Sequence, residues 1–225
     1  MTSPLFKYQF WHAFLLAILL ICLYQITKHH PIILQGELWD VPTKTWFVIA
    51  VLVPICHQIY VWLCWRLQLH HKTITKSLGE RGFTIYKIGF AILIILRPVS
   101  LTFLAISNAN TFRINSTLSM SLTVICLLLS GYLFYSVKRY FTADRAFGKD
   151  HFYPDIFKSK PFVKGGIFKY TSNGMYIYGF LLLYVPGLIW QSQAAILIAL
   201  FNHIYIWVHF YTVEQPDIKL IYNSK

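Results

Sequence analysis

Long apolar runs separated by short polar connections dominate this chain. A helix that crosses a bilayer needs about 20 mostly apolar residues, because it rises about 1.5 Å per residue through about 30 Å of hydrocarbon. The runs that approach or reach this length are residues 10–27, 46–65, 86–107, 118–137, 175–190 and 194–211. The last two are short and are separated only by Gln191, Ser192 and Gln193, so they form a hairpin that crosses either fully or partway. The pattern predicts an all-α polytopic membrane helical bundle with five to six transmembrane helices and a C-terminal helical hairpin.

Basic residues predict the orientation of these segments, because connections rich in Lys and Arg stay on the cytoplasmic side. The first and third connections carry only Lys28, Lys44 and Arg113. The second carries Arg66, Lys72, Lys76, Arg81 and Lys87, and the fourth carries Lys138, Arg139, Arg145, Lys149, Lys158, Lys160, Lys164 and Lys169. We therefore expect the second and fourth connections and both termini in the cytoplasm, in a bacterial inner membrane or the endoplasmic reticulum.

Composition agrees with a membrane protein and excludes a soluble globular domain. Of the 225 residues, 56% are hydrophobic and 12% are charged, whereas soluble domains carry about 25% charged residues. The net charge of +12 in so apolar a chain fits contact with anionic lipid, and no nucleic-acid partner is expected. The cysteines lie inside apolar runs without zinc-binding spacing, so no metal site is expected: Cys22, Cys56, Cys64 and Cys126.

The connection over residues 138–169 is long for a segment between two membrane helices. Connections beyond about 15 residues are uncommon unless they have a function. We therefore divide the chain into N-terminal transmembrane helices, residues 1–137, and a C-terminal part, residues 138–225, in which the connection contributes to a site.

Polar residues inside the apolar runs are candidates for function. Arg97 lies near the middle of the third run, where an unpaired Arg costs about 2.5–3.5 kcal/mol, so it must face protein, water or a polar ligand. A structural bond to a carbonyl group that Pro98 leaves free is the alternative. His57 and Gln58 in the second run are expected to bond between helices.

The last run carries four residues on one helical face. His203, Trp207, Phe210 and Glu214 are spaced 4, 3 and 4 residues apart, so they line up along a helix. An aromatic wall that ends in a carboxylate suits a cationic ligand. The alternative is an aromatic belt at the membrane interface with a solvent-exposed Glu. On neighbouring faces, polar residues expected at the lipid interface are Asn202 and His209.

Within residues 163–222 the chain reads VKGGIFKYTSNGMYIYG, an apolar hairpin, and then HFYTVEQPDIKLIY. This order of motifs resembles the C-terminal part of the integral-membrane methyltransferases that act on phosphatidylethanolamine and on isoprenylcysteine carboxylates. The matching residues are Gly165, Gly166, Tyr170, Asn173, Met175, Tyr176, Gly179, Glu214, Pro216 and Tyr222. The Asn-x-Met-Tyr form is more similar to the phospholipid N-methyltransferases than to the isoprenylcysteine enzymes. The chain departs from the family where Gly174 replaces a usual Pro and Gln215 replaces a common second Glu.

The resemblance implies methyl transfer from S-adenosylmethionine to the ethanolamine headgroup of a membrane lipid, in a pocket open to the cytosol. The implied cofactor-binding residues are Gly166, Tyr170, Asn173, Met175, Tyr176, Gly179, Trp207 and Glu214. A lipid ammonium with a pKa near that of Lys, about 10.4, must lose a proton before it attacks, so a catalytic base is expected. Glu214 is the first candidate for this base and His203 the second. Candidates to hold the lipid phosphate are Arg97, Arg139, Lys149 and Lys164.

Other functions remain open at this point. The same fold can methylate an isoprenylcysteine carboxylate or a small thiol. A sterol-type membrane reductase would bind a nicotinamide cofactor instead, and a non-enzymatic membrane scaffold or transporter would bind neither cofactor. The lipid bilayer is an expected partner in every case, and the sequence does not set the oligomeric state.

Overall fold

The computed structural model describes residues 3–223, and 82% of the chain is helical. Within these residues, the helices long and apolar enough to cross a membrane are Pro4–His29, Thr43–His71, Thr73–Ser107, Ser116–Phe141 and Gln193–Tyr222. Their principal α-helices are α1 (Gln9–His29), α2 (Thr43–His71), α4 (Gly82–Ser107), α5 (Ser116–Ser136) and α11 (Gln193–His209). The prediction of an all-α polytopic bundle is confirmed, and the protein is an integral membrane protein.

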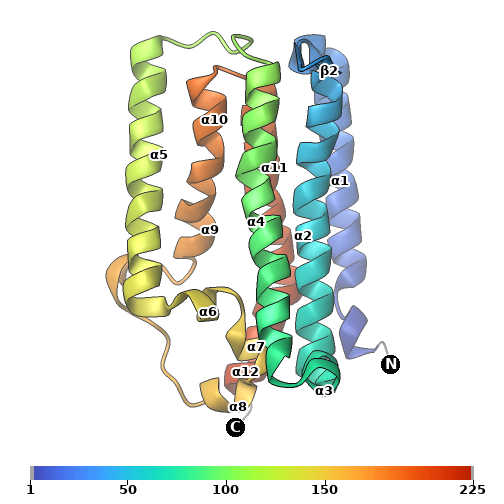
Figure 1. Ribbon diagram of the computed structural model, residues 1–225, viewed down its shortest axis with the longest axis vertical. Coiled ribbons are helices and arrows are strands. Elements are labelled where there is room, and N and C mark those ends of the chain that lie inside the picture. Colours follow the sequence, from blue (N-terminus) through green and yellow to red (C-terminus); the bar gives the residue numbers. More distant parts are fainter. Residues whose placement is uncertain (1–2, 224–225) are drawn as a thin grey trace.

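The long helices lie side by side (Figure 1). Helices α1, α2, α4 and α5 alternate in direction, and α11 runs in the same direction as α5 because a shorter arm returns the chain between them. One end, drawn at the bottom of Figure 1 and called the lower end here, holds the start of α1 and the short helices. These are α3 (Thr73–Leu78), α6 (Ala143–Ala146), α7 (Lys149–Phe152), α8 (Pro154–Phe157) and α12 (Gln215–Asn223). The connections rich in Lys and Arg therefore gather at the same end as the first and last helical residues. That this end faces the cytoplasm stays a prediction from the charge rule.

The C-terminal hairpin has a short first arm and a long second arm. The first arm is the apolar run Gly174–Ile189, made of α9 (Gly174–Tyr178), the 3₁₀-helix η6 (Gly179–Leu183) and α10 (Tyr184–Ile189). Because a 3₁₀-helix rises about 2.0 Å per residue and an α-helix about 1.5 Å, this arm is about 26 Å long. It therefore extends through most of the hydrocarbon thickness of about 30 Å.

The second arm, α11, is the central helix of the bundle. It packs against α1, α2, α4, η6 and α10. Small side chains allow these close approaches, since Ala194, Ala195 and Ala199 are fully buried. At the turn, a Cβ atom on Gly187 would lie 2.8 Å from the side chain of Ile196, so glycine lets α10 and α11 meet.

Asn108 joins the segments at the upper end of the bundle. Its amide nitrogen donates to the carbonyl oxygens of Ile32 and Gln35, 3.0 and 2.8 Å away. Its side-chain oxygen accepts from the Ser192 hydroxyl and from the backbone N–H of Ala194. The connection between α1 and α2, which contains the 3₁₀-helix η2 (Pro31–Leu34) and the antiparallel strands β1 (Glu37–Leu38) and β2 (Val41–Pro42), is thereby fixed to the hairpin turn.

Candidate active site

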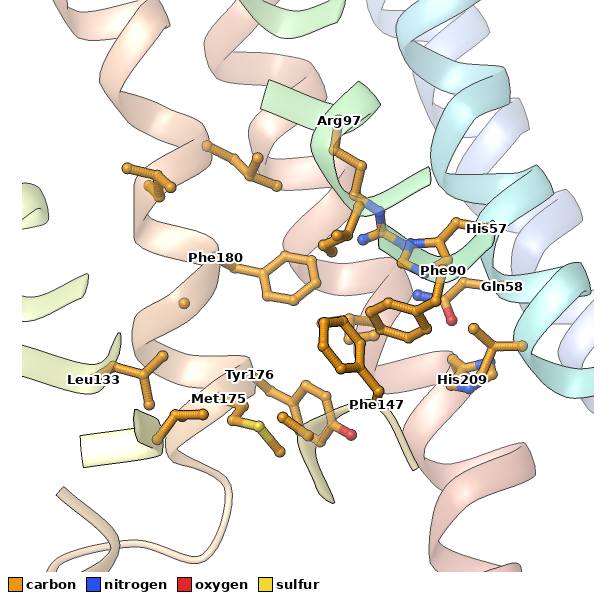
Figure 2. Close-up of a pocket in the computed structure, with 18 of the residues that line it drawn as sticks. His57, Gln58, Phe90, Arg97, Leu133, Phe147, Met175, Tyr176, Phe180 and His209 are labelled. Atoms are coloured by element: carbon orange, nitrogen blue, oxygen red, sulfur yellow. The ribbon is translucent and has the colours of Figure 1, made fainter. Parts of the chain in front are cut away.

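A cavity of about 400 Å³ lies between the helices. Its wall comes from α2, α4, α5, α6, the α9–η6 segment, and α11 with the π-helix η7 (Phe210–Glu214) (Figure 2). Most of the lining is apolar or aromatic, including Phe90, Leu133, Phe147 and Phe180. The polar and charged side chains on the wall are His57, Gln58, Arg97, Tyr176, His209 and Glu214. Apolar walls with a few polar groups are typical of a small-molecule site.

Tyr176 and Glu214 of the cavity wall belong to an aromatic cluster that ends in a carboxylate. The Tyr176 hydroxyl donates a hydrogen bond to Oε2 of Glu214, which joins α9 to η7. The Tyr176 ring packs against Trp207 and Phe210, with ring centroids 5.8 and 5.4 Å apart. Trp207, Phe210 and Glu214 therefore share one face, as their spacing predicts, and this face meets Tyr176.

The helix changes form at Glu214 because a proline follows. Pro216 has no N–H to donate to the carbonyl oxygen of Thr212, four residues earlier. The backbone before it is a π-helix, Phe210–Glu214, a form often found at functional sites. The Thr212 carbonyl oxygen accepts instead from the Arg66 guanidinium, 3.0 Å away. Arg66 of α2 thus holds the turn that carries Glu214.

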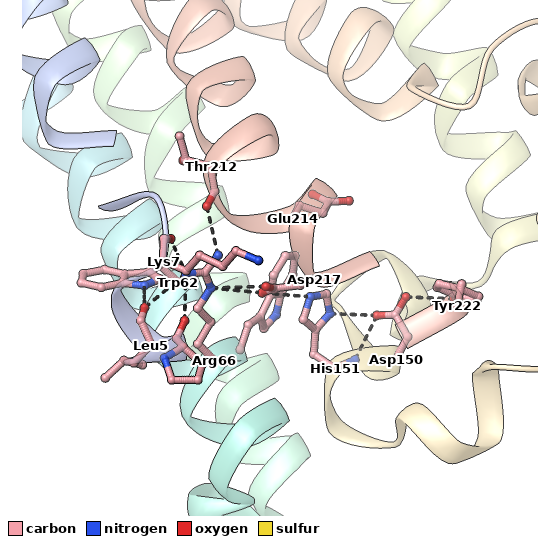
Figure 3. A network of polar contacts seen from close by, with 12 residues as sticks. Leu5, Lys7, Trp62, Arg66, Asp150, His151, Thr212, Glu214, Asp217 and Tyr222 are labelled. Carbon is pink, nitrogen blue, oxygen red and sulfur yellow. Dashed lines mark hydrogen bonds and ion pairs between the residues drawn. The ribbon is translucent and has the colours of Figure 1, made fainter. Parts of the chain in front are cut away.

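A buried polar network extends from Arg66 to the C-terminal helix (Figure 3). The Arg66 guanidinium lies 3.3 Å from the Asp217 carboxylate, and the side chains are 1% and 5% exposed. His151 lies 3.8 Å from the same carboxylate and 3.0 Å from Asp150 on its other side. The Tyr222 hydroxyl donates to Asp150. The network fixes α12 against α2 and α7.

Protonation of the His151 and Asp150 pair is set by their contact. Burial lowers the pKa of His151, but the hydrogen bond and charge of Asp150, together with the charges of Asp217 and Glu214, outweigh burial and leave that pKa raised. Burial raises the pKa of Asp150, but the hydrogen bond and charge of His151, the hydrogen bond from Tyr222 and the charge of Arg145 together outweigh burial and leave that pKa lowered. Both shifts favour an ion pair. Trp65 stacks on His151 with ring centroids 3.9 Å apart and also lines the cavity, so the pair supports the cavity wall.

Unpaired nitrogen atoms gather deeper in the cavity, around Arg97. Arg97 is 2% exposed, and within residues 3–223 its Nε and Nη2 atoms have no hydrogen-bond partner. The same holds, in that part of the chain, for both ring nitrogens of His57 and of His209. The Arg97 guanidinium also lies over the Phe180 ring, 5.5 Å from its centre. Buried polar atoms are usually paired, so these unpaired atoms require an explanation.

The predicted site residues divide into those on the cavity wall and those elsewhere. The residues on the wall are Arg97, Met175, Tyr176, Gly179 and Glu214. The Trp207 ring packs against that of Tyr176, and Asn173 is the N-cap residue that precedes α9. His203 packs between Phe180 and Tyr184 and is not among the lining residues. Their proposed roles stay predictions.

The remaining predicted residues lie in the connection at the lower end. Gly166 has a φ of +58°, and a Cβ atom there would lie 2.5 Å from the Ser136 hydroxyl at the end of α5. Tyr170 is 75% exposed. The basic residues of this region lie away from the cavity wall: Arg139 over the Tyr140 ring, Lys149 paired with Asp144, and Lys164 exposed.

Two predictions about polar residues on α11 are wrong. Asn202 and His209, expected at the lipid interface, are 1% and 2% exposed. The reason is that α11 is surrounded by other helices, so its polar faces meet protein. His57, expected to bond between helices, lines the cavity with both ring nitrogens unpaired in the described chain. His57 and Arg97 both lie near the middle of their apolar runs. This shared depth is a sequence signal that could have predicted that their side chains line one cavity.

Comparison with known proteins identifies one family. Residues 115–225, just under half of the chain, match the model of the phospholipid methyltransferase family. No curated protein and no solved structure matches the chain. The matched residues begin where α5 begins and include the hairpin, Tyr176 and Glu214. The cavity walls contributed by α2 and α4 lie outside the match.

Proposed function

We propose, from the match of residues 115–225 to the phospholipid methyltransferase family, that the protein transfers a methyl group from S-adenosylmethionine to the ethanolamine headgroup of a membrane phospholipid. The observation that carries the proposal is the contact between Tyr176 and Glu214 on the wall of a cavity of about 400 Å³. We also retain the division at residues 137 and 138 as a proposal, with the C-terminal part supplying the cofactor contacts.

The cavity fits such a cofactor in size and in chemistry. Sites for ligands of this size have volumes of about 300–1,000 Å³. S-adenosylmethionine carries a cationic sulfur and a zwitterionic amino-acid group. Tyr176 offers a ring face and Glu214 a carboxylate for positive charge, while Arg97 offers a guanidinium for negative charge. Gly179 lies on the same wall, where a Cβ atom would lie 3.1 Å from the side chain of Leu133, so glycine lets η6 approach α5.

The residues of the chain have three tasks in this reaction. When bound, S-adenosylmethionine supplies an electrophilic methyl group on a positively charged sulfur. The apolar walls hold the reactants in line and exclude water, and such alignment can contribute about 7–11 kcal/mol. Glu214 is the proposed base for the lipid ammonium. Because the hydrogen bond from Tyr176 occupies Oε2, Oε1 is the atom proposed to accept the proton.

The lipid is proposed to enter from the side, between α4 and α5. The cavity wall includes Ile94 and Pro98 of α4 and Phe134 of α5. Phe134 is 51% exposed on the outer surface of the bundle. Acyl chains can therefore stay in the bilayer while the headgroup reaches Glu214. Arg139 and Lys164 remain candidates to hold its phosphate at the lower end.

The test uses purified protein in nanodiscs made of phosphatidylcholine and phosphatidylethanolamine, with isotopically labelled S-adenosylmethionine. We expect labelled mono- or dimethylated phosphatidylethanolamine, identified by mass spectrometry. Glu214→Gln should lose about 10²- to 10⁴-fold in turnover, the range for loss of a general base, and this loss should exceed any loss of cofactor affinity from the missing charge. Glu214→Ala and His203→Ala, measured for binding and turnover separately, distinguish anchoring from proton transfer.

Glu80→Gln is the matched control. It is the same substitution at an exposed residue outside the cavity, in the 3₁₀-helix η3 (Gly79–Arg81). It should leave turnover unchanged. Full activity in all Glu214 and His203 variants would remove these two residues from the mechanism. Methyl transfer to an isoprenylcysteine or a thiol, and not to the lipid, would show that the proposed acceptor is wrong. Binding of NADPH without binding of S-adenosylmethionine would favour a reductase over a methyltransferase.

A further inference from the structure

The inner part of the cavity contains a buried cation without a counterion. Within residues 3–223, no carboxylate forms an ion pair with Arg97, and its Nε and Nη2 atoms have no partner. Pro98 frees the carbonyl oxygen of Ile94, which made a structural bond possible. No hydrogen bond joins the Arg97 side chain to the Ile94 carbonyl oxygen, so a structural bond of this kind does not account for Arg97.

The position of Arg97 directs its side chain along the cavity. Helical side chains point toward the N-terminus of their helix. For α4 that terminus is Gly82 at the lower end, where α12, the helix that directly follows Glu214, also lies (Figure 1). Figure 2 shows the Arg97 guanidinium beside His57, with Tyr176 toward the other end of the cavity.

Histidine side chains add donors to this part of the wall. His57 and His209 line the same cavity and are each 2% exposed, with both ring nitrogens unpaired in the described chain. A neutral imidazole donates one N–H, and a guanidinium donates from a planar fork that matches an oxyanion. Three side chains from α2, α4 and α11 thus offer donors to one space.

From these contacts, and resting on the function proposed above, we propose that Arg97, with His57 and His209, forms an anion subsite for the oxyanion of a zwitterionic ligand whose cationic group lies against Tyr176 and Glu214. Both reactants carry such a pair of charges. The methyl donor has a carboxylate beside its ammonium and sulfonium, and the lipid headgroup has a phosphate beside its ammonium.

Depth favours the carboxylate of the methyl donor. His57 lies midway along α2 (Thr43–His71), and Arg97 lies past the middle of α4 as counted from its lower end. A phosphodiester at that depth would draw the glycerol of the lipid away from the interface. The amino-acid group of the methyl donor is attached to no glycerol or acyl chain, so it can reach that depth. This subsite comes largely from α2 and α4, outside the residues that match the family.

The experiment compares two donors and two variants. Isothermal titration of the protein in phosphatidylcholine nanodiscs would measure binding of S-adenosylmethionine and of its decarboxylated analogue. The wild type should bind the intact donor about 10- to 100-fold more tightly, as expected for a hydrogen bond to a charged group. In Arg97→Met this ratio should fall to near one, and Arg97→Lys should recover part of it. Arg113→Met is the matched control, because Arg113 is exposed at the upper end.

Each outcome separates the two sources of the oxyanion or rejects the subsite. If the ratio of donors is unchanged in Arg97→Met but the KM for phosphatidylethanolamine rises, the subsite holds the lipid phosphate. If both donors bind equally to the wild type and the KM for lipid is also unchanged in Arg97→Met, the subsite does not exist. Equal weakening of both donors, with no change in their ratio or in the KM for lipid, would assign Arg97 a structural role only. A wild type that binds neither donor would overturn the proposed function and this inference with it.

Discussion

Replacing Arg66 by Met tests how the N-terminal helices hold the turn that carries Glu214. The Arg66 guanidinium donates to the carbonyl oxygens of Lys7 and Thr212 and pairs with Asp217. Met keeps much of the apolar stem and removes every one of these donors. The variant therefore leaves the Asp217 carboxylate, whose side chain is 5% exposed, with only the longer 3.8 Å contact to His151.

The expected loss follows from this burial. Removing one partner of a buried ion pair destabilises a protein by about 3–5 kcal/mol, because the other charge stays unpaired. In a chain of this size 1 kcal/mol corresponds to about 2–4 °C in Tm, so Tm should fall by about 6–20 °C. The Lys158 and Asp155 pair, with side chains 53% and 78% exposed, gives the comparison, since such pairs contribute about 0–1 kcal/mol.

Thermal unfolding in nanodiscs, followed by tryptophan fluorescence, measures the effect. Asp155→Asn is the control and should leave Tm within about 4 °C of the wild type. The double variant Arg66→Met/Asp217→Leu should recover part of the loss, because neither charge is then left alone. A single Arg66→Met variant that melts no lower than the control would refute the argument that this network holds α12 in place.

Three further variants or conditions test other parts of the structure by unfolding in nanodiscs. Asn108→Ala should lower the free energy of unfolding by about 1–3 kcal/mol for each partner left unsatisfied, and an unchanged value would contradict its joining role. Gly36→Ala should cost at least about 1–2 kcal/mol, because its φ is +104° and a Cβ atom would lie 2.1 Å from the Ser107 carbonyl oxygen; a neutral result would show that the connection adapts. The raised pKa of His151 stabilises the fold below its unfolded value of about 6.5 and ceases to do so as pH rises through the folded pKa, whereas the lowered pKa of Asp150 stabilises the fold above about 3.9 and ceases to do so in acid. Melting temperatures measured against pH should therefore fall on the alkaline side, and His151→Gln should flatten that fall; an equal slope in both proteins would assign it to other groups.

The sequence was most informative where one physical term dominates. Long apolar runs must become helices in lipid, because only a helix or a closed barrel satisfies the backbone there. The predicted runs accordingly coincide with helices α1, α2, α4, α5 and α11. The short arm Gly174–Ile189 was ambiguous because its reach depends on the 3₁₀ turns of η6, which apolar character does not reveal.

The candidate site was only partly accessible from the sequence. The helical face of Trp207, Phe210 and Glu214 was predictable, because those residues are neighbours along one helix. Tyr176 was found through its motif, but its hydrogen bond to Glu214 was not. His57 and His209 were assigned other roles, because nothing in their local pattern indicates that α2 and α11 face one cavity.

By itself the sequence determined that this is a helical membrane protein, because apolar length and charge asymmetry act locally on each segment. The sequence also contains the motif through which residues 115–225 match the phospholipid methyltransferase model. Only the tertiary structure decided that, within residues 3–223, Arg97 is buried with its Nε and Nη2 atoms unpaired, and that Arg66 donates to the carbonyl group freed by Pro216. These contacts join residues far apart in the chain, and such pairings depend on how whole helices pack.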